Sequence, residues 1–253
     1  MSVVEATETD AAPFEVKLGD EQTEFSGTTR LFAEVAERFG VNLEPQERKD
    51  WQTLGRAAYI IDQYLDVERD VVEPDIAPKL FSGEPIAGVP AELSEDCRQF
   101  IERQTEVRQS EIRQRLELVK LLVERQAAAV TPAEVVRIRR EEAELLTNLS
   151  SLATDGRHDV SGRHRFNAWL GTFYSTGYLL DSFLDVKEDF ENGASGVEPN
   201  LHSRLVIGAA AMKEALSATR KMSPRLLGKC ALVAFRYEIR NKKPDFKNPG
   251  EVI

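Results

Sequence analysis

The sequence predicts an all-α fold, a bundle of long helices around a central apolar core or cavity. Apolar residues recur at helical spacing along most of the 253-residue chain. They are not interrupted by any credible run of alternating polar and apolar residues, which a β-strand would need. The helical segments are long and the links between them are short, which is the arrangement of a helical bundle.

In the first part of the chain, two helices and a loop are expected. Apolar residues at helical spacing predict a helix over 28–39, which Gly40 should end. A long helix is predicted from about residue 47 to residue 72. Four prolines and two glycines then predict a loop over 73–92, because both residue types interrupt regular structure.

The middle of the chain is predicted to form two more helices. Ser94 is the expected N-cap of a long helix that ends near residue 130. Thr131 is followed by a proline at the first helical position and by Glu134 at the third, which is the pattern of a capping box. A further helix is therefore expected from this point to about residue 153.

The last part of the chain begins with a polar loop over 154–163. A long helix is expected over 164–191, and the Asn192-Gly193 pair should end it. One or two further helices are predicted between residues 202 and 240. The whole reads as a single domain over 21–241, after an acidic disordered leader at 1–20 and before a loose tail at 242–253.

Composition and charge exclude several classes of function. The formal net charge of −10 argues against non-specific binding of nucleic acid, which needs clustered lysine and arginine. The two cysteines, Cys97 and Cys230, are far apart and form no CxxC, which argues against a disulfide framework and a zinc site. The chain start lacks the features of a signal peptide, and no apolar run approaches the length of a membrane span. These observations fit a cytoplasmic protein.

Two segments in opposite halves of the chain repeat one pattern. Residues 59–70 read YIIDQYLDVERD, and residues 178–189 read YLLDSFLDVKED. In each segment three aspartates stand four residues apart, so a helix would place them along one face. The residues between them are almost all apolar, which is typical of a buried helix. The candidate metal ligands are Asp62, Asp66 and Asp70 of the first motif and Asp181, Asp185 and Asp189 of the second.

Carboxylates that face an apolar interior need cations or protons to offset their lost hydration. Two such motifs facing each other would make an oxygen-rich site for a hard divalent ion such as Mg²⁺. The alternatives are that the aspartates face water on two amphipathic helices, or that the repeat is left over from a duplication without function. A single motif would favour the first alternative, whereas two copies within apolar helices favour the metal site.

With these two motifs the chain resembles the class I isoprenoid synthase superfamily, in its squalene/phytoene-synthase-like branch. The segment LLDSFLDVKEDFENG is similar to the second Asp-rich motif of that branch. It is also similar to the LxDYxxDxxED pattern of tetraprenyl-β-curcumene-synthase-like terpene cyclases. The segment SGTTRLF at 26–32 is similar to the branch's N-terminal segment, which carries serine and a basic residue near the substrate. The resemblance spans about residues 25–240, and the two Asp motifs are its specific part.

The resemblance implies an isoprenoid-synthase-like bundle in which the two motifs lie on opposite walls of one cavity. It implies a Mg²⁺-dependent terpene synthase that ionises a prenyl diphosphate and cyclises or rearranges the carbocation. Up to three Mg²⁺ ions held by the carboxylates would clamp the diphosphate. The residues it assigns to catalysis are Asp62, Asp66, Asp181 and Asp185. The sequence departs from the branch at Gln63, where an acid is common, and at Asp181, where asparagine is common.

Further candidates surround these motifs. The candidate diphosphate-binding residues are Arg30, Lys187, Arg236 and Tyr237, with Arg165 as an additional cation, and the candidate cavity residues are Tyr59, Tyr174 and Tyr178. Tyr174 and Tyr178 share a helical face with Asp181, although core packing explains them equally well. The run Arg137–Arg140, followed by three glutamates, is interpreted as a solvated helix face with ion pairs between successive turns.

Three rival functions remain open. The first is a prenyltransferase that joins two prenyl diphosphates head to head, as enzymes of the squalene/phytoene type do. The second is a non-catalytic helical scaffold or partner subunit. The third is a di-metal carboxylate bundle, which ranks low because that class uses Glu-x-x-His and the sequence contains none. By analogy with the family, a homodimer is also expected.

Overall fold

The computed structural model confirms the all-α prediction. It describes residues 32–67, 75–154 and 158–220, and over 62–67 it describes the backbone alone. Of the described residues, 79% are helical and none forms a strand. The predicted leader at 1–20 and tail at 242–253 lie outside the described residues.

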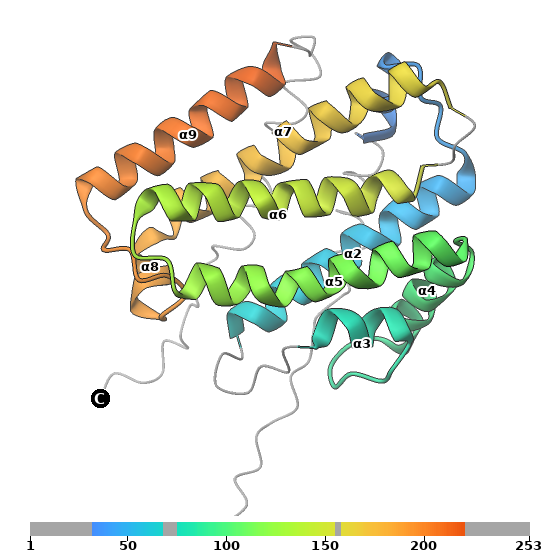
Figure 1. Ribbon diagram of the computed structural model, residues 1–253, viewed down its shortest axis with the longest axis horizontal. Helices are drawn as coiled ribbons and strands as arrows, with labels where there is room; N and C mark the ends of the chain where they lie inside the picture. The colour runs from blue at the N-terminus through green and yellow to red at the C-terminus, as the bar shows by residue number, and fades with distance from the viewer. Residues whose placement is uncertain (1–31, 68–74, 155–157, 221–253) are drawn as a thin grey trace, which may run out of the picture.

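Helices follow one another closely along the chain (Figure 1). Residues 32–38 are helical, and after them come α2 (Pro45–Val67), α3 (Ile76–Ser82), α4 (Ala91–Glu102), α5 (Glu106–Ala127), α6 (Pro132–Leu152), α7 (Val160–Leu184), α8 (Val186–Glu191) and α9 (Leu201–Thr219). The helix α6 packs on both α5 and α7, and α9 covers α7. The short helices α3 and α4 pack on each other and on α2.

Local signals set several helix ends as predicted. The Thr131 side chain accepts a hydrogen bond from the Glu134 backbone N–H, and the Glu134 carboxylate accepts one from the Thr131 backbone N–H, so the capping box of α6 is confirmed. Gly40 has a φ of +80°, a left-handed conformation that glycine adopts without strain, and it follows the helical residues 32–38 as expected.

Three predicted boundaries are wrong. The expected loop over 73–92 contains α3, because Pro78 stands in the first turn of that helix, where a missing backbone N–H costs nothing. The expected helix from Ser94 to residue 130 is two helices, since Thr105 caps a new one by accepting from the backbone of Arg108. Ser94 itself is buried inside α4. The expected helix over 164–191 is likewise two, α7 and α8.

An aromatic cluster fixes the position of α7 in the bundle. Phe166 and Trp169 of α7 are fully buried, and their rings stack at a centroid distance of 6.2 Å. Trp169 also stacks on Phe173 at 5.2 Å, and Phe32 meets Trp51 of α2 edge-on at 5.5 Å. Pairs of this geometry stabilise a core beyond their buried area. Phe166 also lies 5.7 Å from the Trp51 ring, so the cluster connects the N-terminal half of α7 to α2, and this anchoring positions the C-terminal turns of α7.

Two further findings bear on the composition arguments. No described helix combines the length and the apolar character that crossing a membrane requires. Cys97 is buried as a free thiol, and burial raises the pKa of that thiol, so it is poorly suited to act as a thiolate ligand or nucleophile.

Candidate functional site

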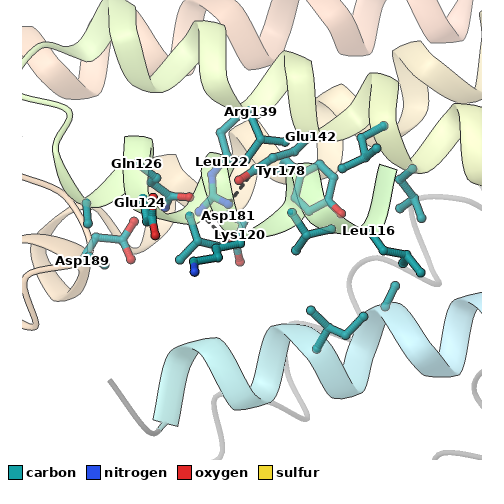
Figure 2. A pocket seen from close by; sticks show the side chains of 18 of the residues that line it. Leu116, Lys120, Leu122, Glu124, Gln126, Arg139, Glu142, Tyr178, Asp181 and Asp189 are labelled. Carbon is teal, nitrogen blue, oxygen red and sulfur yellow. Dashed lines mark hydrogen bonds and ion pairs between the residues drawn. The ribbon is translucent and has the colours of Figure 1, made fainter. Parts of the chain in front are cut away.

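A cavity of about 540 Å³ lies among α2, α5, α6 and the C-terminal part of α7 (Figure 2). Leucine, isoleucine, valine and alanine side chains of α2, α5 and α6 form most of its apolar lining, together with Phe81 of α3. Its polar lining residues are Lys120, Glu124 and Gln126 of α5, Arg139 and Glu142 of α6, Tyr178, Asp181 and Asp185 at the end of α7, and Glu188, Asp189 and Asn192 in and after α8.

The two ends of this cavity differ in polarity. Figure 2 shows Asp189, Glu124 and Gln126 at one end and Leu116 at the other. Leu116 begins the stretch of α5 that lines the cavity, and Glu124 and Gln126 lie near the end of that stretch. We call the end with Asp189, Glu124 and Gln126 the polar end, and the end with Leu116 the apolar end. A ligand that fills the cavity would therefore need a polar head and an apolar tail.

The second Asp motif lines the polar end. Asp181, Asp185 and Asp189 all border the cavity, but they do not lie on one continuous helix as predicted. Asp185, with φ −100° and ψ 9°, separates α7 from α8. The Asp185 backbone N–H still donates to the Asp181 carbonyl at 2.9 Å, and that of Asp189 to the Asp185 carbonyl at 2.8 Å. Because the helical bonds continue through this break, all three aspartates remain on the cavity side.

Arg139 is the principal residue that the sequence interpretation missed. Its side chain is only 11% exposed, so the predicted solvated face is wrong for this position. Arg139 Nε donates to Ser182 Oγ at 2.7 Å, and Arg139 Nη1 donates to Glu142 Oε2 at 2.9 Å. Arg139 Nη2 lies 3.9 Å from Asp181 Oδ2, and the guanidinium lies 5.9 Å from the centre of the Tyr178 ring.

Charge holds Arg139 in its protonated state. Burial alone would lower the pKa of the guanidinium, since it disfavours the charged form. The carboxylates of Glu142, Asp181 and Asp189 outweigh burial and raise the pKa above its ordinary value. The polar end therefore contains a permanent, partly desolvated cation beside the second Asp motif.

A signal for Arg139 was present in the sequence. Arg139, Glu142, Leu146 and Leu149 recur at helical spacing, and all four line the cavity. Their positions along the helix therefore place Arg139 and Glu142 on the same face of α6 as the apolar residues Leu146 and Leu149. The solvated-face interpretation fits Arg137, which is exposed, whereas Arg140 pairs with Glu214 of α9 at 2.8 Å.

The structure brings only some of the other candidates to the cavity. Tyr178 lines it beneath Arg139. Tyr174 lies instead in the aromatic cluster, half-buried, with its hydroxyl 3.3 Å from Ser150 Oγ, and the loss of hydration there raises the pKa of Tyr174 to about 12. Tyr59 is half-buried and packs against the core. Lys187 is exposed, with Nζ 3.6 Å from Glu191 Oε1, and Arg165 donates to Ser161 on the surface.

The first Asp motif can be placed only by its backbone. Asp62 and Asp66 belong to the last turns of α2, and Asp62 directly follows Ile61, which lines the cavity. Their side chains lie outside the described part of the structure, as do the whole of Asp70, Arg30, Arg236 and Tyr237.

The polar end fits Mg²⁺ in the chemistry of its donors. Asp181, Asp185, Glu188 and Asp189 supply carboxylate oxygens, the ligands that Mg²⁺ prefers. Within the described residues, no three acidic, histidine or cysteine side chains gather closely enough to form a metal site by themselves. Mg²⁺ commonly takes one or two protein carboxylates and completes its shell with water and substrate phosphates, so this lining is compatible with it.

No protein-family model matches this sequence, and neither a curated protein nor a solved structure matches it.

Proposed function

We propose that this protein is a Mg²⁺-dependent class I terpene synthase that ionises a prenyl diphosphate and cyclises or rearranges the resulting carbocation. The observation that carries the proposal is the division of one cavity into a polar end, which contains the second Asp motif and Arg139, and an apolar end. A prenyl diphosphate has the same division, with an anionic head and a hydrocarbon tail.

The charge of the polar end supports a requirement for metal. Its described lining contains the cations Lys120 and Arg139 and the anions Glu124, Glu142, Asp181, Asp185, Glu188 and Asp189. This excess of negative charge would repel a diphosphate that arrived alone, since like charges in a partly desolvated site cost energy. Divalent cations between the carboxylates and the phosphate oxygens would reverse that repulsion.

In this proposal Asp181, Asp185 and Asp189 hold Mg²⁺, and the resemblance of the first motif implies that Asp62, Asp66 and Asp70 add further carboxylate ligands. Bound Mg²⁺ would stabilise the negative charge that develops on the departing diphosphate. Arg139 contributes from the protein itself. Its planar guanidinium can donate two parallel hydrogen bonds to phosphate oxygens, and it is already oriented by Ser182 and Glu142.

The apolar lining has two roles in the proposed reaction. It binds the tail through the hydrophobic effect, and it keeps water away from a carbocation that water would quench. Water exclusion is supported by the burial of Leu54, Ala57, Phe81 and Leu116, each at most 5% exposed. The Tyr178 ring lies near the polar end, where its face already interacts with one cation, Arg139.

The test is pyrophosphate release from geranyl, farnesyl and geranylgeranyl diphosphates, with Mg²⁺ and with a chelator. Wild-type protein should release pyrophosphate only with metal, and Asp185→Asn should lose the activity. Glu144→Gln removes an exposed carboxylate of α6 outside the cavity and should leave the rate unchanged. Release that is unaffected by Asp185→Asn would refute the assigned site. Absence of release from every substrate would instead favour the helical scaffold.

Product mass separates the proposed cyclase from the head-to-head prenyltransferase, because the latter joins two substrate molecules. By analogy with the family we also propose a homodimer, which size-exclusion chromatography with light scattering would test. From the cysteine usage we propose a cytoplasmic location, which imaging of a tagged chain would test.

A further inference from the structure

The outer face of α9 carries a row of exposed apolar residues, which we call the α9 stripe. Leu201, Leu205, Met212 and Leu216 are between 54% and 74% exposed, and Ala209 among them is also exposed. At about 100° of rotation per helical residue, these five side chains fall within about 80° of the helix circumference. By the helical rise the stripe is about 22 Å long. None of the five lines the cavity, so the stripe belongs to a different surface.

The α9 stripe lies at the edge of the bundle (Figure 1). The opposite face of α9 packs on α7 and α6, and there Ser203, Ile207, Ala211 and Ala218 are buried. A helix on the surface of a globular protein normally turns a polar face away from the core. A continuous apolar stripe in that place is typical of an interaction surface.

Basic residues flank the α9 stripe on both sides. By the same rotation, Lys213 and Arg220 lie within about 40° of one edge, and Arg204 lies beyond the other edge. The one acidic residue of α9, Glu214, lies on the opposite side of the helix and pairs with Arg140 at 2.8 Å. The free face of α9 therefore presents apolar and cationic side chains together, although the chain as a whole has a net charge of −10.

The sequence that directly follows Arg220 adds to this positive charge. Residues 221–253 contain eight lysines and arginines and three acidic residues, which gives a formal net charge of +5, so residues 1–220 have a net charge of −15. The same segment contains the apolar run CALVAF at 230–235. A charge asymmetry of this size is typical of a chain that binds an anionic surface through its basic part.

We propose that the α9 stripe docks on the surface of an anionic phospholipid membrane. An amphipathic helix with basic flanks lies in the plane of such a membrane, with its apolar side chains at the boundary of the acyl chains and its cations at the headgroups. Leu205 and Met212 enter that boundary, and Arg204 and Lys213 lie at the level of the lipid phosphates. The acidic remainder of the protein is screened, because the Debye length of about 8 Å at physiological ionic strength is less than the diameter of one helix.

Charge also distinguishes the membrane from two other occupants of the α9 stripe. A second copy docked through its own α9 stripe would bring the basic flanks of both copies together, and like charges across an interface are unfavourable. Residues 221–253 of the same chain would meet the same repulsion, since their net charge is also positive. An anionic lipid surface attracts all of these cations at once.

The experiment measures co-sedimentation of the full chain with vesicles of phosphatidylcholine alone and with vesicles of equal parts phosphatidylcholine and phosphatidylserine. Wild-type protein should bind the anionic vesicles more tightly by about tenfold or more. The double variant Leu205→Gln/Met212→Gln should weaken this binding by about tenfold, and Lys213→Glu by about fivefold. The matched controls on α5 are Val107→Gln, at an exposed apolar site, and Arg113→Glu, at an exposed basic site. Both controls should bind as wild type does.

Equal binding to the two kinds of vesicle, or binding to neither, would overturn the inference. An unchanged affinity in the double variant would also overturn it, because residues outside the α9 stripe would then hold the membrane. If the double variant instead changes from dimer to monomer in light scattering, with vesicle binding unchanged, the stripe is an interface between two copies. Should the double variant fail to fold, as checked by circular dichroism, Lys213→Glu decides alone. None of these outcomes depends on the proposed function, since vesicle binding is measured without substrate.

Discussion

Replacing Arg139 by methionine should destabilise the fold strongly, because it leaves Glu142 without its partner in a poorly hydrated place. The two side chains are 11% and 14% exposed and lie 2.9 Å apart. Removing one member of a buried ion pair typically costs about 3–5 kcal/mol, since the other charge stays buried and uncompensated. For a chain of this size that loss corresponds to a fall in Tm of roughly 6–20 °C. Most of the loss in the free energy of unfolding should therefore come from the Glu142 carboxylate, which stays buried without its Arg139 partner.

The assay is urea unfolding of the full chain for Arg139→Met, Glu142→Gln and the double variant. Because the double variant leaves no unpaired charge, it should be more stable than the sum of the two single losses implies, which is the result of a double-mutant cycle for interacting residues. Arg137→Met, on the exposed face of the same helix, is the control and should change stability by less than about 0.5 kcal/mol. An Arg139→Met variant as stable as this control would refute the buried pair.

Three further predictions concern single sites in the fold. Gly162→Ala should destabilise the fold by about 1–3 kcal/mol, because the added Cβ would lie 2.4 Å from the Phe39 carbonyl oxygen. Gly177→Ala should instead stabilise α7 by up to about 1 kcal/mol, because no atom lies within 4 Å of the added Cβ. Thermal unfolding of the two variants checks the sign of each change. Thr131→Ala should cost about 1 kcal/mol by removing the N-cap of α6, and urea unfolding beside a Thr172→Ala control, at a half-buried site within α7 that caps no helix, would measure it. The pKa of Tyr174 is raised to about 12 by burial, so its contribution to stability is complete below the ordinary tyrosine pKa and is lost as pH rises toward 12. Tyr174→Phe should therefore lose less stability than wild type between about pH 9 and pH 11.5, and an unchanged slope would contradict the assignment.

Much of the helical framework could be predicted because its signals are local. The capping box at Thr131 and the left-handed Gly40 depend on neighbours within a few residues, and both were located correctly. The break between α4 and α5 could not be predicted in the same way. Arg103 and Gln104 interrupt no helix by themselves, and the turn exists because Thr105 can cap a second helix that packs elsewhere. Pro78 led to the wrong prediction of a loop, because a proline interrupts a helix in its interior but is tolerated in the first turn, where Pro78 lies in α3.

The candidate site was predicted in part for a related reason. The spacing of Asp181, Asp185 and Asp189 indicated a shared environment, and all three border one cavity. The partner of these acids lies on another helix, α6, and spacing within one segment carries no information about it. Arg139 stands in a run of charges whose other members face solvent or pair across the surface. Only the helical phase of Leu146 and Leu149 distinguishes it, and that phase becomes decisive once the cavity is known.

The excess of carboxylates at the polar end also limits which ligands can bind there. A site with this charge can accept an anion that arrives with divalent cations, or it can accept a cationic amphiphile directly. Arg139 discriminates between them. It is held in its charged form beside Tyr178, and it would repel an organic cation while offering a hydrogen-bonding fork to phosphate oxygens. We therefore expect calorimetry to find inorganic pyrophosphate bound with Mg²⁺ and not with a chelator. Arg139→Lys, which keeps the charge but loses the fork, should weaken this binding by about tenfold, as the loss of a charge-assisted hydrogen bond implies. Binding of a quaternary alkylammonium in place of pyrophosphate, unaffected by Mg²⁺, would show that the carboxylates themselves are the ligand site and would refute the diphosphate assignment.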